Sequence, residues 1–104
     1  MVLDTKKLET AAFILKTIAH PVRIGIVELL TRNERLSVSD ICANLGTEQS
    51  LTSHHLLIMK LKGILSAKRE GKNIYYSLKM KEVEKIIACI EMCEVPNLEE
   101  SGTL

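Results

Sequence analysis

The feature that most constrains the fold is a helix, a glycine turn and a second helix, followed at once by a hairpin. The first helix is expected over residues 37–45, because the run SVSD at its start has the form of a capping signal and Gly46 is a typical helix end. Thr47 can cap the second helix, which is expected over residues 48–62, and Gly63 closes it. The spacing therefore predicts a helix-turn-helix.

After Gly63 the pattern changes from a helical period to an alternating one. Residues 64–69 and 74–78 alternate apolar and polar side chains, which is typical of strands with one buried face. Residues 70–73 (EGKN) between them contain the Gly and Asn that a tight hairpin turn favours. A hairpin directly after a helix-turn-helix predicts a wing.

Three further helices complete the predicted fold. Apolar residues at helical spacing indicate helices over residues 5–18, 21–31 and 80–94, and His20 before Pro21 separates the first two. Pro96 is expected to stop the last helix and residues 97–104 to form a flexible tail. The prediction is a mainly α, α+β winged helix-turn-helix in a single domain, residues 1–96.

Charge and composition narrow the function. The net charge is only +1, but residues 60–72 hold five cations and one acid, which favours a local surface for an anionic partner. The N-terminal residues lack the long apolar run of a signal peptide or membrane span, so a cytoplasmic protein with no membrane partner is expected. No phosphate-binding loop or catalytic cluster stands out, so neither an enzyme nor a cofactor is expected.

The residue types in the helix-turn-helix and the wing suit double-stranded DNA. The second helix of such a motif lies in the major groove, and its first half here is rich in hydrogen-bonding side chains. In the wing, basic side chains suit phosphates or the minor groove. The expected DNA contacts are Thr47, Gln49, Ser50, Ser53 and His54 on or before the helix, and Lys68, Arg69 and Lys72 in the wing.

Over residues 15–78 the chain resembles the ArsR/SmtB family of regulators. The resemblance rests on LKTIAHPVRIGIVELL, then LSVSDICANLGTEQSLTSHHLLIMKLKGIL, then AKREGKNIYYSL. It implies a homodimer built by the first and last helices, and a repressor that an inducer releases from its operator. It also places His55 on the recognition helix, where it packs or bonds a phosphate, and makes His20 a structural cap.

The resemblance leaves two types of inducer open. Metal-sensing members carry two cysteines where this chain has Ser37 and Ser39, and the last helix lacks the His and Asp of the zinc-sensing members. Resemblance to thiol-sensing members implies a pairing of Cys42 with Cys93, with Cys89 in reserve. The alternatives are a soft-metal or metalloid site at Cys89 and Cys93, and three cysteines that are merely buried.

A different class of function also stays open. The recognition helix carries Leu51, Leu57 and Leu61, more apolar surface than a DNA-facing helix needs. If these leucines are exposed, a winged domain that binds a protein partner becomes the alternative.

Overall fold

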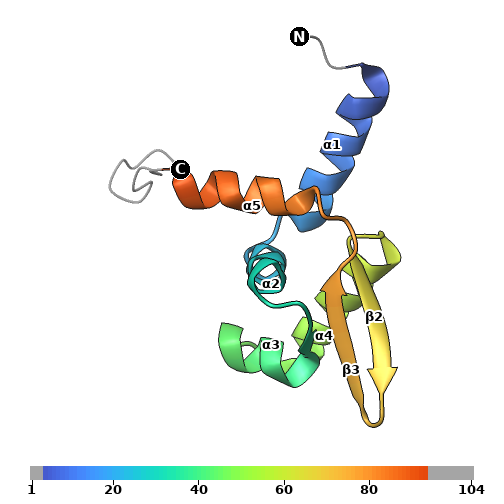
Figure 1. The fold of residues 1–104 in the computed structure, drawn as a ribbon, viewed down its shortest axis with the longest axis vertical. Helices are drawn as coiled ribbons and strands as arrows, with labels where there is room; N and C mark the ends of the chain where they lie inside the picture. The colour runs from blue at the N-terminus through green and yellow to red at the C-terminus, as the bar shows by residue number, and fades with distance from the viewer. Residues whose placement is uncertain (1–3, 94–104) are drawn as a thin grey trace.

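The computed structural model describes residues 4–93, which form five helices and a three-stranded antiparallel sheet (Figure 1). The elements follow one another as α1 (Thr5–Ile18), α2 (Pro21–Arg32), β1 (Leu36–Ser37), α3 (Val38–Leu45), α4 (Gln49–Leu61), β2 (Leu65–Glu70), β3 (Asn73–Leu78) and α5 (Val83–Met92). This confirms the predicted winged helix-turn-helix. Pro96 and the predicted tail lie outside the described residues.

The helix ends follow the capping residues in the sequence. His20 caps α2, because its Nδ1 accepts a hydrogen bond from the Val22 amide at 3.1 Å. Ser37 and Asp40 form the reciprocal capping box of α3, and Gly46 ends that helix with a φ of 63° in the left-handed region. These contacts fix where α3 begins and ends.

The sheet contains one strand that sequence reasoning missed. The strand order is β1-β3-β2, and Leu36 pairs with Tyr76 while Ser37 pairs with Tyr75. Residues 31–36 were expected to be only a polar connection, because a two-residue strand has no alternation to detect. β1 joins the start of α3 to the wing.

The last helix is shorter than expected. It was predicted to begin at Met80, but the backbone turns through residues 81 and 82 and α5 starts at Val83. Val83 and Ile87 are buried in the core, whereas Ile90 is exposed. Only part of the predicted apolar face of this helix is therefore covered within one chain.

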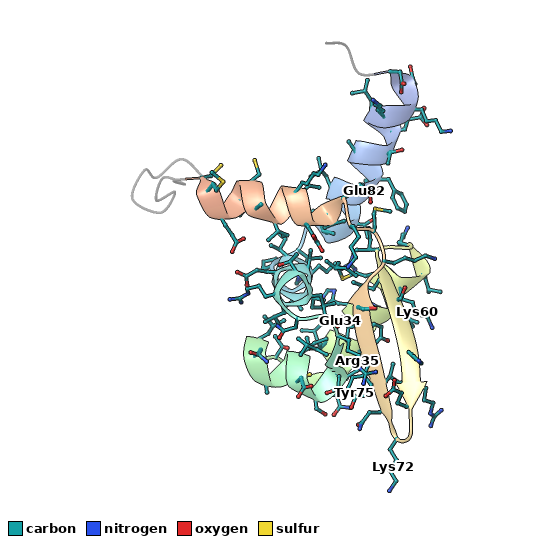
Figure 2. The ribbon with its side chains drawn as sticks, in the orientation of Figure 1. Glu34, Arg35, Lys60, Lys72, Tyr75 and Glu82 are labelled. Atoms are coloured by element: carbon teal, nitrogen blue, oxygen red, sulfur yellow. The ribbon has the colours of Figure 1, made fainter. Side chains whose placement is uncertain are left out.

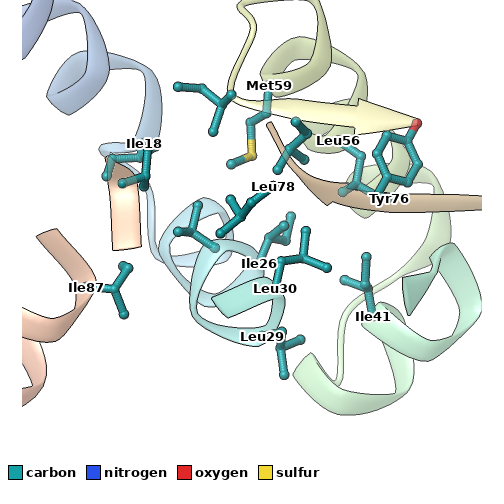
Figure 3. Close-up of a cluster of buried hydrophobic side chains, with 14 of the residues drawn as sticks. Ile18, Ile26, Leu29, Leu30, Ile41, Leu56, Met59, Tyr76, Leu78 and Ile87 are labelled. Carbon is teal, nitrogen blue, oxygen red and sulfur yellow. The ribbon is translucent and has the colours of Figure 1, made fainter. Parts of the chain in front are cut away.

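The core lies between α2, α4, α5 and the inner face of the sheet (Figure 3). Its fully buried members include Ile26, Ile41, Leu56, Met59 and Leu65. Figure 1 places α1 and α5 at one end of the molecule and the wing, α3 and α4 toward the other. Within residues 4–93, every helix is too short or too polar to cross a bilayer.

Candidate nucleic-acid interface

One face of the recognition helix α4 packs against the core, and the other face is exposed to solvent. Thr52, Leu56 and Met59 are fully buried. Gln49, Ser50 and His54 are exposed and Ser53 is half-buried. The polar side chains predicted to read DNA therefore lie mainly outside the core.

The start of α4 differs from the prediction. Thr47 does not cap the helix; its hydroxyl hydrogen-bonds the Thr52 hydroxyl at 2.6 Å. The cap position belongs to Glu48, whose side chain caps no amide, and the Ser50 hydroxyl donates to the Glu48 carboxylate. Glu48 was not among the expected DNA contacts, and it places a negative charge beside two residues that were, Thr47 and Ser50.

A crevice of about 220 Å³ brings residues of α3, α4 and the wing together. It is lined by Ser37, Val38, Ser39, Gln49, Ser53, Lys72, Asn73 and Ile74. Three predicted DNA contacts thus share one concave surface, although Lys72 is far in sequence from Gln49 and Ser53. The N-terminus of α3 opens on the same crevice and adds a partial positive charge.

The wing presents its basic side chains on both faces and at its tip. Lys68 pairs with Tyr75 across the hairpin and Arg69 with Ile74, so the two cations point to opposite faces. Gly71 takes the left-handed φ of 64° that the tight turn needs. Lys72 extends from this turn away from the rest of the protein (Figure 2).

An ion pair that sequence reasoning missed holds the tip end of the wing, where Glu70 ends β2 beside the hairpin turn. The Arg35 guanidinium donates to the Glu70 carboxylate and lies over the Tyr75 ring, 4.2 Å from its centroid (Figure 2). This hydrogen bond raises the pKa of Arg35 and lowers the pKa of Glu70. Arg35 directly precedes β1, and the pairing of β1 with β3 brings it next to Tyr75 and Glu70 of the wing.

His55 does not lie with the other predicted DNA contacts. It is 5% exposed, and its Nδ1 accepts a hydrogen bond from Arg23 Nε at 3.0 Å. The prediction of a DNA contact does not fit this placement, because α4 turns His55 inward while the neighbouring His54 faces solvent. Burial, followed by the charges of His20, Arg23 and His54, lowers the pKa of His55.

The three cysteines are free and do not converge. Cys42 is half-buried on α3, whereas Cys89 and Cys93 are exposed on and just after α5. Figure 1 shows α2 between α3 and α5. A disulfide needs Cα atoms within about 7 Å, so the structure does not support the predicted Cys42–Cys93 pair within one chain.

Several known proteins are similar to this chain in sequence. Residues 20–67 match the model of the bacterial regulatory protein, arsR family. The transcriptional repressor PagR of Bacillus anthracis is 41% identical over 85 residues, 82% of this chain and 85% of PagR. The regulator YgaV of Escherichia coli is 33% identical over 88 residues, 85% of this chain and 89% of YgaV.

Solved structures agree with these sequence matches. The crystal structure of PagR has a TM-score of 0.74 at 40% identity and covers 84% of this chain and 99% of its own. HlyU from Vibrio cholerae has a TM-score of 0.77 at 28% identity, covering 85% of this chain and 95% of its own. With a helix-turn-helix, a basic wing and relatives that are regulators rather than enzymes, this chain belongs to the ArsR family of DNA-binding transcriptional repressors.

Proposed function

We propose that this repressor binds its operator as a homodimer, with α4 of each subunit in a major groove and the wing beside it. The observation that carries the proposal is the crevice that Gln49 and Ser53 of α4 line together with Lys72 at the tip of the wing. A polar concave surface next to a recognition helix suits a DNA backbone that passes between helix and wing.

The site residues divide into two roles in this proposal. Lys68, Arg69 and Lys72 are exposed cations that contact phosphate or the minor groove. Gln49 and His54 are exposed near the start of α4 and, with Ser53, read base edges. Lys72→Ala is expected to weaken all duplexes alike and to lower the salt dependence by about one unit.

The exposed apolar residues of α1 and α5 support the dimer. Leu8 and Leu15 of α1 are 53% and 52% exposed, and Met92 of α5 is 85% exposed. The two helices lie at the end of the molecule away from the wing (Figure 1), so a second copy can cover them and leave both wings free. Together, residues 1–96 would then supply both DNA binding and dimerisation.

Selection from a randomised duplex library tests DNA binding and symmetry together. We expect enriched sequences with two half-sites about 10 base pairs apart, centre to centre. Leu15→Asp is expected to produce monomers in sedimentation and to weaken the enriched duplex. The exposed Lys16→Ala is the matched control on the same helix. A wild-type monomer with no enriched sequence would refute the proposal.

The exposed leucines of α4 favour a second candidate, protein binding, and the same selection separates the two. Leu57 and Leu61 are 48% and 74% exposed, and Leu51 is 46% exposed beside the base-reading residues. Leu51 suits contact with a thymine methyl group. Steep salt dependence of duplex binding supports the DNA role, whereas its absence would favour a protein partner.

We propose further that cysteine oxidation or persulfidation releases the operator, and that it acts on Cys89 and Cys93. Their side chains are exposed beside Ile90 and Met92, within the surface assigned to the dimer. A persulfide or sulfenic acid there adds polar or charged atoms to an apolar contact. Cys42 is half-buried on α3, outside the surface assigned to the dimer, so this proposal does not involve a bond between Cys42 and Cys93.

Mass spectrometry beside DNA binding tests the inducer. After treatment with polysulfide or peroxide, loss of DNA binding is expected to follow modification of Cys89 or Cys93, and the Cys89→Ser/Cys93→Ser variant is expected to stay bound. Cys42→Ser is the matched control and should respond normally. Release by Cd(II) or As(III) but not by oxidants would instead indicate that the α5 thiols of two subunits hold a soft metal.

A further inference from the structure

A polar connection links the end of α1 to the recognition helix through the interior. Arg23 of α2 donates from Nη1 to the Thr17 carbonyl oxygen at 2.7 Å and from Nε to His55 Nδ1 at 3.0 Å. One guanidinium therefore touches α1 and α4 at once. The planar, rigid fork of arginine makes such a bridge directional, which a flexible lysine cannot reproduce.

The chemistry of this bridge fixes the protonation state of His55. A guanidinium can only donate hydrogen bonds, so Nδ1 must be the acceptor and the neutral ring must carry its proton on Nε2. Among residues 4–93, no group forms a hydrogen bond with His55 Nε2, which is buried. A second proton on this ring would place an N–H against the Arg23 donor and would end the hydrogen bond.

Among the described residues, the groups that face the His55 ring disfavour a positive charge on it. The groups that face His55 are His20, whose ring centroid lies 4.4 Å away, Arg23 of α2, and His54, whose ring centroid lies 6.0 Å away on α4. The electrostatic interaction of each of these three groups with His55 lowers the His55 pKa. Burial acts in the same direction, because it disfavours the charged form of His55.

From this geometry we infer that Arg23 and His55 form a proton-sensitive latch, which holds α4 to the end of α1 only while His55 is neutral. The inference rests on the proposed DNA-binding role of α4. His55 is thus a positioning residue: it touches no DNA but sets the orientation of the helix that does. Acid is expected to open the latch and weaken operator binding.

The chain allows this effect to be isolated, because His20, His54 and His55 are its only histidines. His20 and His54 have to be replaced, so that any pH response of DNA binding that comes from a histidine belongs to His55 alone. A variant with His20→Asn and His54→Asn keeps a helix cap at position 20 and leaves His55 as the single histidine. The test compares each variant with itself at two pH values.

In this single-histidine variant, the Kd for the enriched duplex is expected to rise by about twofold to tenfold between about pH 7.5 and pH 5.5, because a lowered His55 pKa leaves the ring only partly protonated at pH 5.5. Adding His55→Asn should abolish the pH response, because the Asn oxygen accepts from Arg23 and does not titrate. Arg23→Lys should also flatten it. The latch would be overturned if the Kd still changed with pH after His55→Asn is added. It would also be overturned if the Kd of the single-histidine variant did not change with pH.

A measurement without DNA separates failure of the latch from failure of the proposed function. NMR of the His55 ring is expected to show the Nε2–H tautomer at neutral pH. Amides of α4 should lose protection against exchange in acid, relative to their intrinsic rates, in the single-histidine variant but not when His55→Asn is added. A His55 that titrates at or above about 6.5 would refute the latch even if DNA binding is confirmed. The expected titration in a chain that binds no duplex would refute only the proposed function.

Discussion

Gly25 is the position where a single added methyl group tests the packing most directly. A Cβ at this point of α2 would lie 2.9 Å from Leu45 Cδ2 and 3.6 Å from Leu45 Cδ1. Alanine should gain about 1 kcal/mol of helix propensity over glycine. Turning the half-buried Leu45 side chain aside should cost about 0.5–1.5 kcal/mol. We therefore expect Gly25→Ala to change stability by no more than about 0.5 kcal/mol.

Valine at the same position should behave differently. Its two further methyl groups cannot be accommodated by a small rotation of Leu45, and overpacking costs about 1–3 kcal/mol. We expect Gly25→Val to destabilise the protein by about 1–2 kcal/mol, and most of this loss to vanish in a Leu45→Ala background.

Urea unfolding followed by circular dichroism measures these differences. The series should be run at several protein concentrations, because association would raise apparent stability. The reasoning is refuted if Gly25→Val is no worse than Gly25→Ala, or if its penalty is unchanged when Leu45 is alanine. Either result would mean that the close approach of α2 to α3 does not limit the side chain at position 25.

Three further predictions concern the cap, the wing and the effect of acid. Ser37→Ala should cost about 0.5–2 kcal/mol in unfolding experiments, because the Asp40 amide loses its acceptor; no change would show that the capping box is dispensable. Arg35→Gln should return the pKa of Glu70 toward its ordinary value, measured by NMR titration, and an unchanged pKa would contradict the ion pair. Because the pKa of Glu70 is lowered on folding, the stabilisation by Arg35 is present above the ordinary glutamate pKa and is lost as pH falls through the folded value. Wild type and Arg35→Gln should therefore converge in stability in acid; a constant difference down to about pH 2 would contradict this.

The sequence allowed the helices and the hairpin to be placed because their ends are chemically marked. His20, Ser37 and Gly46 each form the predicted cap, and the hairpin turn falls at Gly71. These are local signals, since a cap or a turn involves residues only a few positions apart. The bounds of most elements followed from them to within a residue or two.

The remaining features depend on contacts that are distant in sequence. β1 exists only because β3 pairs with it, and the ion pair of Arg35 with Glu70 spans 35 positions. The resemblance left open whether His55 packs or bonds a phosphate, because its partner Arg23 lies 32 positions away in the sequence. The pairing of Cys42 with Cys93 depends on the arrangement of helices in the same way, and the position of α2 between α3 and α5 does not support it within one chain.

The pairing of β1 with β3 has a consequence for building chimaeras from this protein. The wing cannot be exchanged on its own, because a foreign hairpin would lose the Leu36–Tyr76 and Ser37–Tyr75 pairs and the contact with Arg35. Residues 35–78 enclose all of these contacts together with both helices of the helix-turn-helix. That segment is therefore the smallest unit that could be transplanted into another regulator to transfer its operator preference.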